Sequence, residues 1–342
     1  ASLLTQSAGE SIRRGMIRYM YVVADLSAAM DEGDFFPSRA EALQAVLQAF
    51  VEEFFDQNPL SQLGIIVCRH GRAEKLSELS GNKGAHLDAL RNLFTAAGAA
   101  AVGGYFSLQL ALDAARQSFV VASLSYASRQ VVVLHGALAS IDPHDIMSTV
   151  VELKKERVKV SVITLSAEMF IARRIADETH GQFHVCSNPD ELRDYLFQHV
   201  TPPATLKEDT AEVRMVWWGF PDKVNNETAF CACHSEICRE GYTCPKCNAR
   251  LCTRSAPPST CPVCSLRLAS PAHLARSYHH LFPVPPYTEV VAVAAPVTTC
   301  FACIVPLAAT DTRFMCPLCS HVYCGECDML VHASLHACPG CS

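Results

Sequence analysis

Over the first 200 residues, short apolar runs alternate with longer segments in which apolar side chains recur every three or four positions. Short apolar runs are typical of buried parallel strands, and the longer period is typical of amphipathic helices. Strands are predicted at 20–25, 63–68, 130–134, 159–165 and 183–185, with a further short one at 73–76. Helices are predicted at 38–57, 84–94, 107–119, 143–156, 167–179 and 189–199. This alternation predicts an α/β fold with a doubly wound, mostly parallel sheet and helices on both faces.

The cysteines are distributed unevenly along the chain. Of the 18 cysteines, only Cys68 and Cys186 lie before residue 230, and the other sixteen follow it. Most of these form Cys-x-x-Cys pairs, a spacing that favours zinc binding in a reducing compartment over disulfide bonds. We therefore expect one large domain followed by small zinc-binding modules.

Two Cys-x-x-Cys pairs between residues 231 and 283 have the spacing of a zinc ribbon. They are Cys244 with Cys247 and Cys261 with Cys264, and a proline follows the first cysteine of each pair. Two such pairs can close one tetrahedral zinc site. A second ion in this module is a further expectation, with Cys231, Cys233, His234, Cys238 and Cys252 as candidate ligands. The alternative is that some of these cysteines are free buried thiols. No four-ligand set needs His273, His279 or His280, so we expect them to pack and form hydrogen bonds.

Eight more cysteines follow a connector at 284–299. They are Cys300, Cys303, Cys316, Cys319, Cys324, Cys327, Cys338 and Cys341. Eight thiolates supply two tetrahedral zinc sites, so the expected zinc count is three, or four with the second ribbon site. Their order resembles a RING domain with cysteine at every position. That resemblance implies interleaved sites, with the first and third pairs holding one ion and the second and fourth pairs the other. Sequential pairing, as in tandem zinc fingers, is also compatible with the spacing.

The first predicted strand ends in Asp25, Leu26, Ser27, Ala28 and Ala29. This resembles the start of a von Willebrand A domain, where an Asp-x-Ser-x-Ser turn holds a divalent cation. Here alanine replaces the last serine, and the loop that follows the strand at 130–134 begins with His-Gly where such domains often place an aspartate. Because Mg²⁺ requires near-ideal oxygen coordination, the resemblance supports the fold while bound Mg²⁺ is not expected. The loops at this edge are the expected docking place for a partner.

Signatures of an enzyme are missing from the first 200 residues. Ser27, His135 and Asp142 could be considered as a catalytic triad, but no Gly-x-Ser-x-Gly turn surrounds the serine. A Walker loop and a dinucleotide-binding fingerprint are also absent from the sequence. We therefore predict that the protein is not an enzyme.

Net charge and hydropathy exclude two further classes of protein. The formal net charge is −6, whereas proteins that bind duplex DNA by themselves usually have a basic surface. Strong autonomous DNA binding is therefore not expected. The apolar stretches at 96–112 and 290–309 are interrupted by glycine, glutamine, proline, threonine or cysteine, so neither is expected to cross a membrane. No secretory signal is expected.

Four segments together resemble one known family. They are FFDQNPLSQLGII (54–66), RAEKLSELSGN (72–82), VSVITLSAE (160–168) and SPAHLARSYHHLFP (270–283), the last directly after the Cys-Pro-x-Cys pairs. The order of modules and these segments are similar to the von Willebrand A, zinc-ribbon and RING subunit of the core transcription factor TFIIH. The resemblance covers nearly the whole chain. The alanine-rich loop at 96–103 and the loop at 135–140 depart from the family pattern.

The resemblance implies a non-catalytic, nuclear subunit of TFIIH that acts in transcription initiation and nucleotide excision repair. In that family the A domain binds and stimulates the XPD-type 5′-to-3′ helicase. The RING-like end docks onto another A-domain subunit of the complex, and further core TFIIH subunits are implied partners.

Residue composition and the resemblance together divide the chain into five parts. We expect an A domain at 1–200, a linker that packs on a domain at 201–230, a zinc-ribbon-like module at 231–283, a connector at 284–299 and a RING-like two-zinc module at 300–342. The alternative function is that of a RING-type ubiquitin ligase whose A domain holds the substrate. Ile304 and Pro339 fit the positions at which such ligases contact a conjugating enzyme.

Overall fold

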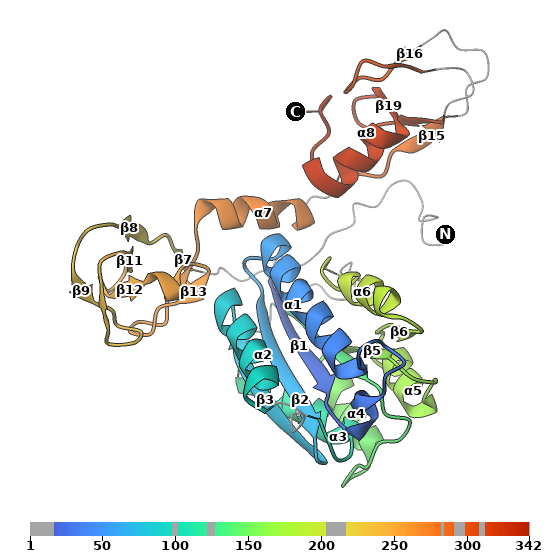
Figure 1. Cartoon of the computed structure of the whole chain (residues 1–342). Helices are drawn as coiled ribbons and strands as arrows, with labels where there is room; N and C mark the ends of the chain where they lie inside the picture. Colours follow the sequence, from blue (N-terminus) through green and yellow to red (C-terminus); the bar gives the residue numbers. More distant parts are fainter. Residues whose placement is uncertain are drawn as a thin grey trace. The chain divides into compact units, whose positions relative to one another are not determined.

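A computed structural model describes residues 17–97, 102–121, 127–202, 217–281, 284–290, 298–307 and 312–341. The chain forms two compact units, one from Gly15 to Ser277 and one that includes Tyr278–Ser342. The first unit holds the A domain and the ribbon module, and the second holds the C-terminal module (Figure 1). Among the described residues, no helix combines the length and apolar character needed to cross a membrane.

A six-stranded sheet forms the centre of the A domain (Figure 1). Its strands are β1 (Arg18–Asp25), β2 (Gln62–Arg69), β3 (Arg72–Ser80), β4 (Ser128–His135), β5 (Val158–Thr164) and β6 (Phe183–Val185), in the order β3-β2-β1-β4-β5-β6. Every neighbouring pair is parallel except β2 with β3, which is antiparallel. The predicted doubly wound, mostly parallel sheet is therefore confirmed.

Strand β3 is longer than the four residues predicted for it. It lies at the edge of the sheet, and none of its side chains is fully buried. An edge strand exposed in this way lacks the continuous apolar run that marks the central strands. For that reason its sequence carried only a weak strand signal.

Helices cover both faces of the sheet, as predicted. They are α1 (Arg39–Gln57), α2 (Lys83–Ala97), α3 (Leu108–Val121), α4 (Ile146–Lys155), α5 (Phe170–Glu178) and α6 (Pro189–Phe197), with a short 3-10 turn at Ala28–Asp31. One apolar core contains side chains of α1, α2 and α6, and the other contains side chains of α3, α4 and α5. The longest of these helices begins where the sequence predicts, because the Ser38 side chain accepts a hydrogen bond from the N–H of Glu41.

The ribbon module and the C-terminal module contain only short strands. The first has β7 (Trp218–Gly219), β8 (Asp222–Val224), β9 (Ala229–Phe230), β10 (Ile237–Cys238), β11 (Gly241–Thr243), β12 (Arg250–Cys252), β13 (Ser259–Thr260), β14 (Arg267–Leu268), a 3-10 turn at Thr253–Ser255 and α7 (Pro271–Leu281). The second has β15 (Thr288–Val290), β16 (Thr298–Thr299), β17 (Pro306–Leu307), β18 (Arg313–Met315), β19 (Val322–Cys324), α8 (Gly325–Leu330) and a π-helical turn at Val331–Leu335. Half of the buried residues in each small core are cysteines.

The predicted packing of the 201–230 linker falls largely on residues outside those described. At its described end, the Trp217 side chain is 75% exposed, whereas the guanidinium of Arg267 lies 5.9 Å from the centre of the Trp218 ring. Only the second tryptophan therefore packs against the ribbon module.

A fully buried arginine joins the first strand to the end of the last A-domain helix. The guanidinium of Arg18 donates hydrogen bonds to the main-chain oxygens of Val200 (2.7 Å) and His199 (2.7 Å) and to Gln130 Oε1 (2.6 Å). It also lies 5.2 Å from the centre of the Phe54 ring. Burial lowers its pKa to about 9, so the side chain remains charged at neutral pH.

Replacing Arg18 should destabilise the A domain strongly. Arg18→Met would leave Gln130 Oε1 and the carbonyl oxygen of His199 without a donor, while the carbonyl of Val200 would keep its hydrogen bond from the Asn58 side chain. We expect a loss of about 3 kcal/mol in the free energy of unfolding. Arg72→Met, on the exposed edge strand, is the matched control and should cost less than about 0.5 kcal/mol. Denaturant titration of the full chain would measure both values. Equal losses in the two variants would contradict a structural role for the Arg18 contacts.

Candidate metal centres

Four groups of side chains have the composition and closeness of metal sites. Within each group all ligand atoms lie within 4.8 Å of one another. The groups are Cys244, Cys247, Cys261 and Cys264; Cys300, Cys303, Cys324 and Cys327; Cys316, Cys319, Cys338 and Cys341; and Cys231, Cys233, His234 and Cys252. The first three, called the four-cysteine groups below, have the ligand set of structural zinc sites.

Sulfur–sulfur distances in the four-cysteine groups fit coordination of one ion. The distances are 3.6 Å for Cys244–Cys264 and Cys247–Cys261, 3.8 Å for Cys303–Cys324, and 3.7 Å for Cys316–Cys341 and Cys319–Cys338. Sulfurs held about 2.3 Å from one tetrahedral ion lie about 3.8 Å apart. A disulfide would require about 2.0 Å, so these pairs have the geometry of a shared ion.

In the C-terminal module, the cysteine pairs alternate between the two groups. The first pair lies with the third, and the second pair lies with the fourth. This is the interleaved arrangement that the RING-like order implies, and sequential pairing would have placed different sulfurs together. The sequence spacing allows both arrangements, and the fold of the module brings together the interleaved one.

Four Cys-x-x-Cys pairs begin in the same main-chain turn. In each, the N–H of the first cysteine donates to the carbonyl oxygen five residues later, and the N–H four residues later donates back to the carbonyl of that cysteine. The turns start at Cys244, Cys261, Cys300 and Cys316, with hydrogen bonds of 2.9 to 3.0 Å. The residue four positions after each of these cysteines has a positive φ: Asn248 (56°), Ser265 (55°), Ile304 (63°) and Ser320 (58°). This left-handed residue reverses the chain, so that both sulfurs of the pair point to one place.

Main-chain N–H groups also favour the thiolate form that a metal requires. Burial raises the pKa of the Cys244 thiol, but donation from the N–H groups of Cys247 and Lys246 outweighs it, and the pKa falls to about 7. At Cys300, burial is again outweighed, by the N–H groups of Cys303 and Cys324, and the pKa is about 6. At these two cysteines the thiolate form that binds a cation is therefore favoured.

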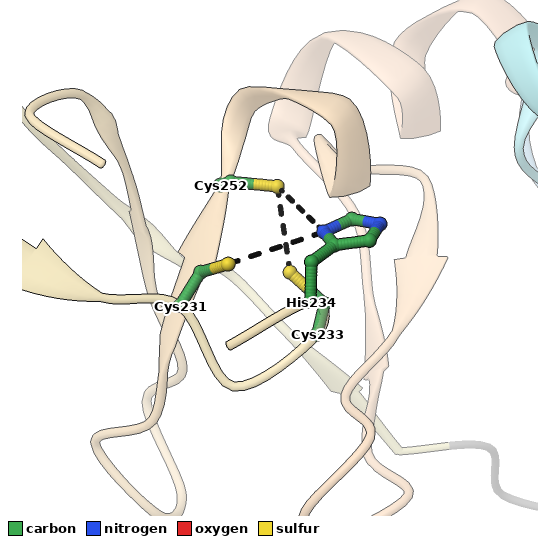
Figure 2. Close-up of side chains that lie close together, drawn as sticks. All are labelled: Cys231, Cys233, His234 and Cys252. Atoms are coloured by element: carbon green, nitrogen blue, oxygen red, sulfur yellow. Dashed lines mark hydrogen bonds between the residues drawn. The ribbon is translucent and has the colours of Figure 1, made fainter. Parts of the chain in front are cut away.

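The mixed group in the ribbon module contains four of its five predicted candidates. Figure 2 shows Cys231, Cys233, His234 and Cys252 turned toward one another. The fifth candidate, Cys238 on β10, does not belong to the group. His273, which we expected to form hydrogen bonds, has its Nδ1 3.2 Å from the N–H of Ser270 at the start of α7. The side chains of His279 and His280 lie outside those described.

The two cysteines of the A domain belong to none of these groups. Burial raises the pKa of both Cys68 and Cys186 to about 12. The Cys68 thiol donates to the carbonyl oxygen of Ser107 at 3.3 Å. Both residues are therefore buried thiols of the apolar core.

The aspartate at the end of β1 is held by main-chain groups. Asp25 Oδ1 accepts from the N–H of Ser27 (2.7 Å), and Oδ2 accepts from those of Gly136 (3.0 Å) and Ala137 (3.2 Å). The guanidinium of Arg39 donates to the carbonyl oxygens of Ala29 (3.0 Å) and Gly136 (3.2 Å). The same guanidinium pairs with the carboxylates of Asp34 (2.6 Å) and Glu32 (2.9 Å), so its charge is balanced locally.

The structure gives other partners to two of the three residues considered as a catalytic triad. Asp142 accepts from the hydroxyls of Ser107 (2.8 Å) and Ser140 (2.7 Å). His135 Nδ1 lies 3.1 Å from the carbonyl oxygen of Ala137, and its ring stacks on Phe106. Among the described residues, the buried hydroxyl of Ser27 has no hydrogen-bond partner. These contacts do not connect a nucleophile to a base.

Comparison with known proteins agrees with this architecture. A family model described as Ssl1-like matches residues 23–221, and one described as a TFIIH C1-like domain matches residues 299–342. The chain is 40% identical to general transcription factor IIH subunit 2 of Arabidopsis thaliana, over 99% of this chain and 81% of that protein. It is 38% identical to general transcription and DNA repair factor IIH subunit ssl1 of Schizosaccharomyces pombe, over 96% and 80%.

The chain is also similar to solved structures that cover about half of its length. One is the VWA domain of SpRpn10, with a TM-score of 0.43 and 19% identity over 52% of this chain and 93% of that one. Another is the N-terminal domain of TFIIH p34, with a TM-score of 0.42 and 15% identity over 54% and 97%.

Removing metal should unfold the small modules and spare the A domain. The A domain is held by two large apolar cores, whereas cysteines make up half of the buried residues in the cores of the small modules. After treatment with a strong chelator, trypsin should cleave within 217–341 at least ten times faster, with little change within 17–200. Mass spectrometry of the fragments would measure both rates. Unchanged cleavage of the small modules would contradict a structural role for bound metal.

Proposed function

Because the chain belongs to the Ssl1-like family of TFIIH subunits, we propose that it is a non-catalytic structural and regulatory subunit of TFIIH. The observation that carries this proposal is similarity over nearly the whole chain to curated TFIIH subunits. The role is in transcription in the nucleus, and it extends to nucleotide excision repair. The S. pombe relative bears DNA repair in its name. The residues considered for catalysis support a non-enzymatic role, because Asp142 and His135 are committed to other contacts.

The finer function is to bind an XPD-type 5′-to-3′ helicase through the A domain and stimulate its unwinding. The carboxyl end of the sheet is the candidate surface, because ligands of such sheets bind there. Loops at this end carry Phe36, Tyr105, Leu138 and Ile141, whose side chains are 88%, 67%, 67% and 55% exposed. Large exposed apolar side chains grouped on one edge mark an interaction site.

Hydrogen bonds hold these loops in a defined arrangement. The N–H of Ile141 donates to the carbonyl oxygen of Phe106 at 2.9 Å, which joins the loop after β4 to the start of α3. Arg39 joins the loop after β1 to the loop after β4 through Ala29 and Gly136. A surface prepared in advance of binding loses little conformational entropy when a partner docks.

Stimulation of the helicase would operate through its conformational equilibrium. If the A domain binds the active conformation more tightly than the inactive one, saturating binding multiplies the ratio of active to inactive helicase by the ratio of the two affinities. A tenfold difference in affinity corresponds to about 1.4 kcal/mol. No catalytic group is needed on the A domain for this mechanism.

The zinc modules serve assembly in this proposal. Zn²⁺ occupies the three four-cysteine groups, and the C-terminal module docks onto another A-domain subunit of TFIIH. That module exposes Phe301, Ile304, Val305 and Leu318. Ile304 has a φ of 63°, which is unfavourable for a β-branched side chain, whereas the equivalent turns carry asparagine or serine. An exposed apolar side chain that is present despite this unfavourable backbone conformation supports the proposal that the turn is a contact surface.

Charge introduced at the carboxyl end of the sheet should weaken the helicase interaction. Leu138→Glu and Ile141→Glu would each place a charge in an apolar contact, and we expect at least a tenfold loss in affinity for the helicase. Val151→Glu on α4, where the wild-type side chain is 47% exposed, is the matched control away from this edge. Binding and unwinding would be measured with the full chain and the matching helicase. Stimulation that survives both edge variants would place the helicase contact elsewhere.

The alternative function, a RING-type ubiquitin ligase, is favoured by the RING-like cysteine order, by Pro339 and by Ile304, whose side chain is exposed beside the first site of the C-terminal module. Under the TFIIH proposal, no autoubiquitination is expected with a panel of conjugating enzymes. Activity that is lost in Ile304→Ala while the zinc content is unchanged would support the ligase instead.

A further inference from the structure

A fifth main-chain turn in the chain repeats the geometry of the four Cys-x-x-Cys turns. The N–H of Cys231 donates to the carbonyl oxygen of Glu236 at 2.9 Å, and the N–H of Ser235 donates to the carbonyl of Cys231 at 3.0 Å. Ser235 has a φ of 58°, within the range of the equivalent residues in the other four turns. Cys231 is 2% exposed, and the first cysteine of each other turn is likewise buried.

This equivalence assigns a position to each side chain of the turn. Cys231 and His234 stand three residues apart, where the other turns carry their two cysteines. His234 therefore takes the place of the second cysteine of the pair. The sequence Cys-Ala-Cys-His hides this, because it does not read as Cys-x-x-Cys, and the turn geometry is needed to recognise it.

The remaining two ligands come from the turn and from a neighbouring strand. Cys233 lies within the turn, and Cys252 is the last residue of β12 (Figure 2). The N–H of Ala232 donates to the carbonyl oxygen of Arg250 at 2.7 Å, which holds the turn against β12. One sulfur is thus supplied from a segment nineteen residues away.

The distances within the group fit one tetrahedral ion. The Cys233 and Cys252 sulfurs are 3.4 Å apart, and His234 Nδ1 lies 3.3 Å from the Cys252 sulfur and 3.9 Å from that of Cys231. These values are close to those in the four-cysteine groups and too long for a disulfide. Three sulfurs and one imidazole nitrogen form a ligand set of structural zinc sites.

We propose that Cys231, Cys233, His234 and Cys252 form a fourth zinc site of the chain, closed by His234 Nδ1. Cys238 is excluded from it: this residue lies on β10, paired with Ala229, and it is absent from the group. The set has four ligands and no open position, which makes it a structural site. The proposal does not depend on the proposed function.

The site would hold a hairpin that has little else to stabilise it. Strands β9 and β10 have two residues each, and a hairpin this short is marginal in water. Its paired side chains Phe230 and Ile237 are 69% and 64% exposed, so apolar burial contributes little. Metal ligation would connect the hairpin to the sheet formed by β8, β11 and β12, and supply the missing folding free energy.

Counting bound metal on the intact chain tests the proposal directly. Native mass spectrometry of the wild type should show one more zinc ion than Cys233→Ser or His234→Ala. The matched control is Cys238→Ser, which removes a cysteine from the same hairpin and should keep the wild-type count. A wild-type count in Cys233→Ser and His234→Ala would overturn the proposal, as would the loss of an ion in Cys238→Ser alone.

A variant that preserves the site controls for the possibility that a substitution loses the ion only because the module misfolds. His234→Cys would turn the site into a set of four cysteines and should retain the ion. In the cobalt-substituted full chain, its visible absorption should differ from that of the wild type, because one nitrogen ligand is replaced by sulfur. Identical spectra of His234→Cys and the wild type would show that His234 is not a ligand, and would also overturn the proposal.

Discussion

Beyond residue 230, the fold depends on one constraint. Cysteine sulfurs from separate turns must come together in small groups. The small modules bury few apolar side chains, and half of the buried residues in their cores are cysteines. Strands of two or three residues cannot form a stable sheet by themselves. The repeated turn, with its left-handed fourth residue after the first cysteine, is the local device that brings two ligands together. The rest of each module follows from how these turns face one another.

The A domain, in contrast, is held together by apolar packing and not by groups of cysteines. Its two apolar cores cover both faces of one sheet, and key buried polar groups find their partners within the domain. Asp25 accepts three main-chain hydrogen bonds, and Arg18 donates to the end of the last helix. Polar groups that could have bound a cation or served in catalysis therefore contribute to loop and strand positions. This leaves the exposed loop edge available for a protein partner.

Membership in the Ssl1-like family unites the two halves of the chain. In the A domain, hydrogen bonds join the loops at the carboxyl end of the sheet to one another. In the small modules, the cysteine groups take the place that a large apolar core has in the A domain. Exposed apolar residues occur in both halves, on the A-domain loops and around Ile304, which agrees with a subunit that has several partners.

Much of the fold could be predicted from the sequence. The spacing of apolar residues and the lengths of apolar runs are set by neighbouring residues, and they indicate helices and strands. The alternation of strands and helices, the start of α1 at Ser38 and the α/β class all follow from such signals. The edge strand β3 was underestimated, because an exposed strand lacks an apolar run. The fully buried Arg18 had no local signal at all, since its partners lie more than a hundred residues away.

For the candidate metal centres too, the sequence predicted one part of the arrangement and the tertiary structure decided the other. Cysteine spacing by itself predicted tetrahedral sites and named the candidate ligands for most of them. Which sulfurs share an ion depends on how distant turns meet in space, and both interleaved and sequential pairing satisfied the spacing. The choice between Cys238 and Cys252 was likewise open, since both follow the Cys-Ala-Cys-His segment. Only the tertiary structure brought Cys252 to that turn, because β12 lies hydrogen-bonded beside it and β10 directs Cys238 elsewhere.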